Sequence, residues 1–166
     1  MSREILFKAK RANWRELPKE EWWVEGNLVW TNDSFEEYRA IIIPKENSDM
    51  FTKSENDDLG FEKWYLVDPE TVCQYVGLTD EDGKRYEGDI FQADNGECTQ
   101  IYIIVWDKHC LEWYAECVGD PDGNLPLCEF RVDEIEVIGN VFDNLNLLLK
   151  GVQQPESPVT HKEETE

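Results

Sequence analysis

The sequence predicts a mainly β protein, and three features of its 166 residues lead to this prediction. Runs rich in β-branched and aromatic residues, such as Ile41-Ile42-Ile43, recur along the chain. Turn residues such as Asp82-Gly83 separate these runs at intervals of roughly 8 to 12 residues. A helical pattern is confined to one short leucine-rich segment near the C-terminal end. We therefore expect one compact unit built as a small β-barrel or sandwich, with a short C-terminal helix.

The first strand is expected over Glu4–Lys10, where the residues approximate a period of two. Ile5, Phe7 and Ala9 share one side of this strand, so we expect this side to be buried. Farther along, Gly26-Asn27 stands between two aromatic runs, which is typical of a β-hairpin turn. The two strands of this hairpin are expected at Glu21–Val24 and Leu28–Thr31.

Further strands are indicated wherever β-branched and aromatic residues lie between turn residues. They are expected at Tyr38–Pro44, Lys63–Val67, Thr71–Gly77, Asp89–Ala93, Thr99–Trp106, Leu111–Cys117 and Glu134–Val141. The polar stretch Lys45–Gly60 predicts a long surface loop.

The C-terminal part is expected to hold one helix and a tail. Asp143 can cap a short helix over residues 145–149, and Gly151 stands just past its end. Residues 151–166 are polar and contain two prolines, so we expect a disordered tail.

Charge is the strongest compositional feature. The chain carries 37 acidic and 16 basic residues, a net charge of −21, so direct binding to nucleic acid or to an anionic membrane is disfavoured. Residues 1–20 hold six Lys/Arg and three Asp/Glu, whereas the remainder holds ten and thirty-four. This asymmetry predicts a basic N-terminal end that could meet an acidic body of another subunit.

Nothing near the N-terminus resembles a signal peptide, and no apolar run approaches the roughly 20 residues needed to span a bilayer. We therefore expect a cytoplasmic protein whose cysteines are reduced. The cysteines are interpreted as small core hydrophobes: Cys73, Cys98, Cys110, Cys117 and Cys128.

Metal sites find little support in the spacing of potential ligands. Asp80-Glu81-Asp82-Gly83 and Asp120-Pro121-Asp122-Gly123 could suggest calcium loops, but Leu78 and Val118 occupy the positions of the first acidic ligand. Turn chemistry explains these side chains better. A zinc site would have to be assembled across strands from Cys98, His109, Cys110, Cys117 and Cys128, which lack zinc-finger spacing.

No catalytic constellation is apparent either. His109 and Cys110 are adjacent, and adjacent residues on a strand point to opposite faces, so they form a poor nucleophile and base pair. Carboxylates are so abundant that no particular pair is indicated. We therefore expect no catalytic, cofactor-binding or metal-binding residues and no enzyme activity, with a hydrolase as a remaining alternative.

Trp22, Trp23 and Trp30 could form a platform for stacking single-stranded bases, but the acidic charge opposes that function. Core or subunit-interface packing is the better interpretation. Because Trp22 and Trp23 are adjacent on a predicted strand, we expect one of them to be exposed or to meet a partner.

Several sequence blocks support a family resemblance. They are Arg3–Phe7, Val67–Val72, Gln74–Asp80, Tyr86–Ile90 and Ile135–Asn144. In these blocks and their order, the chain resembles YopX-like proteins from about residue 3 to residue 149.

The resemblance implies a phage or prophage protein with a small SH3-type β-barrel and additional N-terminal strands. It implies one unit over residues 1–150, with an N-terminal β portion at 1–66 and a barrel-like portion at 67–150. The family has no established activity, substrate or catalytic residues. It usually has glycine where this chain has Cys73. The glycines of the blocks are expected at turns or bulges: Gly77, Gly83, Gly88 and Gly139.

We expect an accessory protein in the cytoplasm of a bacterial host that binds a protein partner or assembles into a homo-oligomer. One alternative is an acidic nucleic-acid mimic that blocks a host DNA-binding protein, an idea motivated by the net charge of −21. The other alternative is a hydrolase with an unrecognised carboxylate site. The sequence specifies neither the partner nor the number of subunits.

Overall fold

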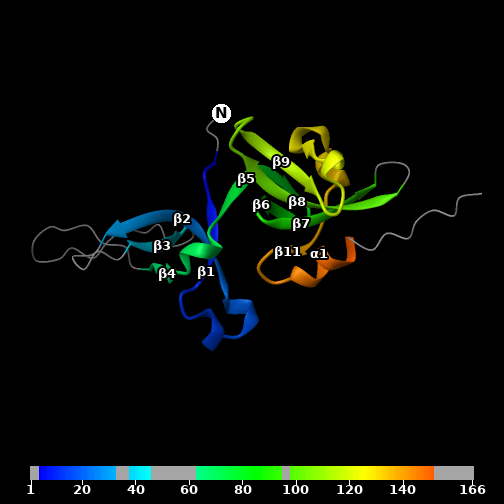
Figure 1. The fold of residues 1–166 in the computed structure, drawn as a ribbon. Coiled ribbons are helices and arrows are strands. Elements are labelled where there is room, and N and C mark those ends of the chain that lie inside the picture. Colours follow the sequence, from blue (N-terminus) through cyan, green and yellow to red (C-terminus); the bar gives the residue numbers. More distant parts are fainter. Residues whose placement is uncertain (1–3, 33–37, 46–62, 95–97, 152–166) are drawn as a thin grey trace, which may run out of the picture.

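The computed structural model describes residues 4–32, 38–45, 63–94 and 98–151 (Figure 1). Within these residues the chain forms two antiparallel sheets and one short α-helix. The prediction of a mainly β protein is therefore confirmed. The predicted loop at residues 45–60, apart from Lys45, and the predicted tail after Gly151 lie outside the described residues.

The first sheet contains the N-terminal strands in the order β4-β3-β2-β1-β5-β6. Their bounds are β1 Phe7–Lys10, β2 Trp23–Asn32, β3 Tyr38–Pro44, β4 Tyr65–Val67, β5 Cys73–Asp80 and β6 Gly83–Tyr86. Strands β1–β4 curl, so that β4 meets the segment that follows β1, and we call these four strands the curl. Arg11 forms a β-bridge with Val67, and the Ala12 N–H donates to the Leu66 carbonyl at 2.8 Å. The curl encloses a small core of Ala9, Ala40, Ile42 and Val67.

The second sheet has the order β10-β9-β8-β7-β11. Its strands are β7 Asp89–Asp94, β8 Thr99–Asp107, β9 Glu112–Cys117, β10 Leu125–Pro126 and β11 Glu136–Asn140, and α1 follows at Leu145–Gly151. Aromatic packing dominates its core, where Phe91 stacks on Tyr102 and Phe130 meets both rings edge-on. Figure 1 shows β1 between the strands β2–β4 of its own sheet and the second sheet.

The expected architecture differs from the structure in two respects. The strands of the second sheet have the open order β10-β9-β8-β7-β11, so the SH3-type barrel expected over residues 67–150 stays a prediction. The first sheet also includes β5 and β6 and thus runs across the expected division after residue 66. No helix in the described part of the chain is long and apolar enough to cross a membrane.

The predicted hairpin at Gly26-Asn27 is wrong, because β2 is one continuous strand. Gly26 pairs with Phe7 of β1 on one side and with Pro44 of β3 on the other. A Cβ atom at Gly26 would lie 2.0 Å from the carbonyl oxygen of Ile43. The glycine therefore permits β2 and β3 to approach each other closely at this position. In the sequence, a glycine with this role cannot be told from a turn glycine.

The predicted burial of β1 is also wrong in part. Ile5 is 60% exposed, whereas Leu6 is buried and Lys10 is only 2% exposed. Both sides of β1 are covered, because Ala9 packs into the core that the curl encloses, while Lys8 and Lys10 reach Asp89 and Asp143. A lysine thus occupies a position that alternation alone assigns to solvent.

The glycines of the sequence blocks lie at the predicted turns and bulges. Gly77, Gly83 and Gly88 have positive φ, and strand pairing shifts register near Gly77 and again at Gly139. This prediction is confirmed. At the position of the expected glycine, Cys73 begins β5, pairs with Lys8 and is buried without a positive φ.

The helix is confirmed, but its predicted cap is not. Gly151 is the last residue of α1 and does not lie past its end. The Asp143 carboxylate accepts a hydrogen bond from the Lys10 side chain at 2.5 Å. Asp143 therefore connects β1 to the segment before the helix.

We predict that Gly26→Ala lowers the free energy of unfolding by about 3 kcal/mol, because the added methyl group forces the Ile43 carbonyl out of place. Urea denaturation followed by tryptophan fluorescence measures this loss. Asn27→Ala, at the exposed neighbouring position, is the control and should change stability by no more than about 0.5 kcal/mol. Equal losses in both variants would contradict the role of Gly26.

Candidate functional site

Two lysines of β1 bind carboxylates that belong to the second half of the chain. Lys8 Nζ lies 2.6 Å from Asp89 Oδ1 at the start of β7, and Lys10 Nζ lies 2.5 Å from Asp143 Oδ1 after β11. The side chains of Lys10 and Asp89 are almost fully buried. Breaking such a buried pair leaves one charge uncompensated, which is strongly destabilising. These pairs therefore tie β1 to the second sheet and its C-terminal extension.

The Lys10 ammonium is surrounded by indole rings. Nζ lies 4.1 Å from the ring centroid of Trp14, 4.8 Å from that of Trp22 and 5.4 Å from that of Trp23. Trp23 Nε1 also donates to Asp143 Oδ2 at 2.8 Å. Ring faces attract a cation most strongly when it has lost its water. We call Trp14, Trp22, Trp23 and Asp143 the Lys10 cage.

The cage corrects the prediction for Trp22 and Trp23. Trp22 is not on a strand: it ends a 3₁₀ turn at Lys19–Glu21 and has helical backbone angles, φ −66° and ψ −45°. The alternation rule for strands does not apply to it. Both rings therefore contact the same ammonium, and both are partly buried.

The sequence blocks supply the groups that hold β1. In Val67–Val72, the Thr71 hydroxyl accepts from the Lys10 backbone N–H at 2.9 Å. In Tyr86–Ile90, Asp89 accepts from the Tyr86 N–H at 2.7 Å as well as from Lys8.

In Ile135–Asn144, a compact turn places the Asp143 carboxylate. The Asn140 side chain accepts from the Phe142 and Asp143 N–H groups at 2.9 and 3.0 Å. Asn144 Oδ1 accepts from the Asn140 N–H at 3.1 Å, and a Cβ atom at Gly139 would lie only 2.5 Å from that oxygen. The glycine thus leaves space for the asparagine that closes the turn.

The two acceptor carboxylates differ in their electrostatics. Burial alone would raise the pKa of Asp143, but hydrogen bonds from Lys10, Asn140 and Trp23 outweigh it and hold that pKa below its ordinary value. Burial dominates at Asp89 and raises its pKa despite the Lys8 ammonium. The fold therefore favours the charged form of the Asp143 carboxyl group and disfavours that of the Asp89 carboxyl group.

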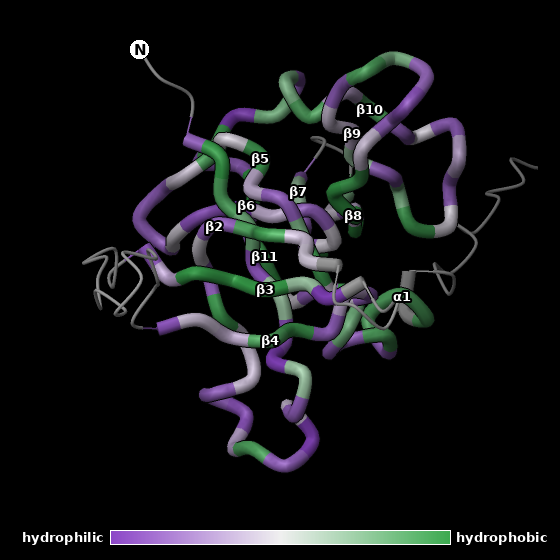
Figure 2. Tube along the Cα trace, turned by 90° about the vertical axis from the view of Figure 1, so that its left-hand side faces the viewer, coloured by the Kyte–Doolittle hydropathy of each residue, from purple (hydrophilic) through white to green (hydrophobic). Residues whose placement is uncertain are grey.

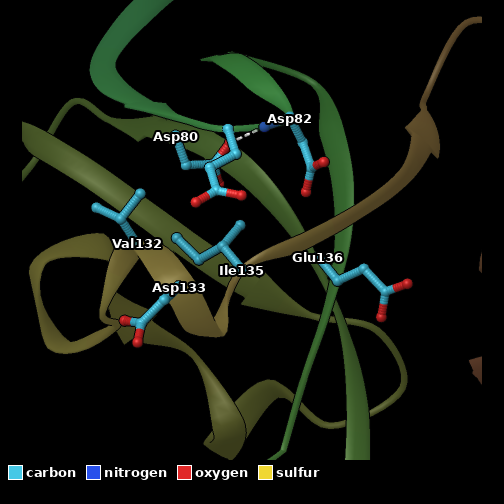
Figure 3. A pocket seen from close by; sticks show the side chains of 7 residues that line it. Asp80, Asp82, Val132, Asp133, Ile135 and Glu136 are labelled. Carbon is cyan, nitrogen blue, oxygen red and sulfur yellow. Dashed lines mark hydrogen bonds between the residues drawn. The ribbon is translucent and has the colours of Figure 1, made fainter.

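A second feature is an acidic groove of about 720 Å³ (Figure 3). Its lining consists of carboxylates around two apolar side chains: Asp80, Glu81, Asp82, Val132, Asp133, Ile135 and Glu136. In Figure 3 the side chains of the β5–β6 turn lie across from those of the 3₁₀ turn Val132–Glu134 and the start of β11. We call these seven residues the acidic groove.

The acidic turns make the hydrogen bonds expected of turn chemistry. Asp80 Oδ1 accepts from the N–H groups of Asp82 and Gly83 at 2.9 and 3.2 Å, and its other oxygen binds the buried Arg85 guanidinium. Asp120 Oδ1 accepts from the Asp122 N–H at 3.1 Å. In the described ranges no three His, Cys, Asp or Glu side chains are grouped so that they could hold a metal ion.

The five candidates for a zinc site do not converge within the described residues. Cys117 is buried, but Cys98, Cys110 and Cys128 are exposed, so their interpretation as core hydrophobes is wrong. His109 and Cys110 lie in the turn after β8, where both N–H groups donate to Asp107 Oδ1. Neither residue is on a strand, contrary to the expectation. Burial raises the pKa of the Cys73 thiol to about 12, as befits a core residue.

A third feature, which sequence analysis did not identify, is an apolar outer face on the curl. Its residues line a cavity of about 250 Å³: Val29, Thr31, Ile41, Ile43 and Trp64. Val29 pairs with Ile41 in the register of β2 and β3, so the two side chains lie on the same side of the sheet. Trp64 is 55% exposed and Val29 39%. Figure 2 shows the hydrophobic colouring of β3 at this end of the molecule. We call these five residues the outer face.

We predict a pH dependence of stability that depends on Asp143. Its folded-state pKa lies below the ordinary value, so it contributes stability above the unfolded pKa of about 3.9, and that contribution is lost as the pH falls through the folded-state pKa. Urea denaturation between about pH 2 and 7 should show a constant advantage of wild type over Asp143→Asn above about pH 5 that disappears in acid.

The exposed Asp122→Asn is the control for this prediction, and its difference from wild type should stay small at every pH. A difference between wild type and Asp143→Asn that does not change with pH would show that the Asp143 charge does not stabilise the fold.

Comparison with known proteins identifies the family of the chain. The family described as YopX protein matches residues 14–149, which include most of the sequence, the whole second sheet and all but the last two residues of α1. The match begins after β1, so it does not include the block Arg3–Phe7. No curated protein matches the chain. Because the matched region holds the turns that bind Lys8 and Lys10 and covers well over half of the sequence, the chain belongs to the YopX protein family.

Proposed function

We propose that this chain is a phage-type accessory protein that acts by binding another protein through the outer face. The observation that carries the proposal is the exposure of Trp64 beside Val29 and Ile41 over an apolar cavity. Contiguous apolar side chains at a surface mark interaction sites, and tryptophan is prominent among the residues that dominate binding energy.

The surroundings of the outer face support this proposal. None of its five residues is charged, although the chain carries 53 charged side chains of Asp, Glu, Lys and Arg, 37 acidic and 16 basic. Depletion of charge at the centre of a patch is typical of protein interfaces. The partner is therefore expected to present an apolar pocket or cleft that accepts an indole ring.

A nucleic-acid mimic is a second candidate, and the acidic groove favours it. Five of its seven residues are carboxylates, and they come from two segments that are distant in sequence. Such an array could occupy the DNA site of a basic protein. Competition distinguishes the two candidates, because a partner bound through the groove is displaced by added duplex DNA, whereas one bound through the outer face is not.

The hydrolase alternative draws less support from the groove. Asp80 is bound to Arg85, Asp133 pairs with Arg131 at 3.1 Å, and Glu136 accepts from Gln92. Carboxylates that already hold partners have structural uses that explain their presence. We therefore propose binding in place of catalysis.

We predict that Trp64→Glu abolishes recovery of the partner when tagged protein is used to capture proteins from a bacterial lysate. Loss of one central aromatic anchor typically costs at least about 2 kcal/mol, or roughly thirty-fold in affinity. Quantitative mass spectrometry measures the recovery. Trp106→Glu, on the second sheet and 44% exposed, is the matched control and should retain the partner. The proposal fails if both variants recover the same proteins as wild type.

A further inference from the structure

A cavity of about 350 Å³ lies beside the Lys10 cage. Its lining consists of the four cage residues, Lys10 itself, and three further side chains, those of Lys19, Phe142 and Asn144. The cavity shares no residue with the outer face or with the acidic groove. Its volume lies within the range of small-molecule sites, which begins at roughly 300 Å³. We call it the tryptophan cavity.

The side-chain oxygens of the lining already accept hydrogen bonds within the chain. Asp143 Oδ1 accepts from Lys10, and Asp143 Oδ2 accepts from Trp23 Nε1 at 2.8 Å and from the Asn140 amide at 3.0 Å. Asn144 Oδ1 accepts from the Asn140 N–H at 3.1 Å. A ligand that offers only donors would therefore have to compete with bonds that hold the fold.

The donors of the lining are in the opposite position. Lys19 is exposed, its ammonium lies 5.7 Å from the ring centroid of Trp22, and it forms no ion pair within the described residues. The Asn144 amide nitrogen donates no hydrogen bond in that part of the chain. Trp14 Nε1 is buried without an acceptor there. The unused hydrogen-bonding capacity of the tryptophan cavity thus consists of donors, and one of them is charged.

The charge of the lining favours an anion. Lys10 and Asp143 neutralise each other, so Lys19 leaves the lining with a net charge of +1, although the whole chain carries −21. Glu16 and Glu20 belong to the neighbouring 3₁₀ turns but do not line the cavity. At physiological ionic strength, charges farther away than about 8 Å are largely screened. The local positive charge is therefore able to attract an anion.

The apolar part of the lining is aromatic. Trp14 meets Trp22 edge-on with ring centroids 4.7 Å apart, and Trp23 meets Phe142 in the same way at 5.9 Å. Aromatic side chains attract a further ring beyond the effect of burial alone, through offset or edge-on contacts. The lining therefore suits a flat apolar ring.

We propose that the tryptophan cavity binds a small aromatic acid, that is, a flat ring bearing one carboxylate. The ring packs against the aromatic side chains, and the carboxylate accepts hydrogen bonds from the Lys19 ammonium and the Asn144 amide. One negative charge matches the one unpaired ammonium of the lining. This inference goes beyond the proposed function and does not rest on it, because the cavity and the outer face share no residue.

The test is a titration of the full chain with benzoate, followed by NMR of the tryptophan indole N–H signals. The signals of Trp14, Trp22 and Trp23 should move, whereas those of Trp64 and Trp106, which are exposed elsewhere, should stay in place. Benzamide has the same ring without the charge, and acetate has the charge without the ring. Both should need at least about five-fold higher concentrations than benzoate.

Lys19→Gln removes the unpaired charge and should weaken benzoate binding about five-fold. Lys63→Gln is the matched control, because Lys63 is also an exposed lysine over a ring, 5.5 Å from the centroid of Tyr65, and lies outside the cavity. It should bind benzoate like wild type. Both lysines are exposed, so both variants should keep the fold, and the NMR spectra without ligand verify this.

Three results would overturn the proposal. They are indole signals of the cavity that do not respond to benzoate, equal binding of benzamide and benzoate, and equal binding of benzoate by the two lysine variants. A loss confined to Lys19→Gln supports the proposal. None of these measurements involves Trp64, so the proposed function is judged separately by the capture experiment with Trp64→Glu.

Discussion

The burial of the Lys10 ammonium is the constraint on which the rest of the structure depends. A lysine that is 2% exposed must find a counter-charge and hydrogen-bond acceptors, or its desolvation opposes folding. Asp143, from a turn 133 residues away, supplies the charge, and three indole rings supply the remaining surroundings. One side chain of β1 therefore brings together the tryptophan turns and the C-terminal turn.

This arrangement also decides which charges remain for binding. Three of the six basic residues at the N-terminal end, Lys8, Lys10 and Arg11, are paired with carboxylates of the same chain. The blocks that mark the family supply those acceptors, which makes them determinants of the fold. The outer face and the acidic groove take no part in these contacts.

Sequence patterns predicted the features that local chemistry determines. The isoleucine run of β3 and the glycines at Gly77 and Gly83 were placed correctly, because β-branching and positive φ act within a few residues. Gly26 was misread because a turn and a close backbone approach favour the same residue. The burial of Lys10 was missed because alternation does not reveal a counter-charge that comes from far along the chain. The outer face was missed because it forms only when β2 pairs with β3.

The most direct test of this account is a double-mutant cycle on the free energy of unfolding with Lys10→Met and Asp143→Asn. We expect a coupling energy of at least about 2 kcal/mol, because Asp143 compensates the buried charge of Lys10. The exposed pair of Arg131 and Asp133 provides a reference cycle, in which coupling should stay below about 1 kcal/mol. A coupling between Lys10 and Asp143 no larger than that reference would contradict the claim that this pair holds the two parts of the fold together.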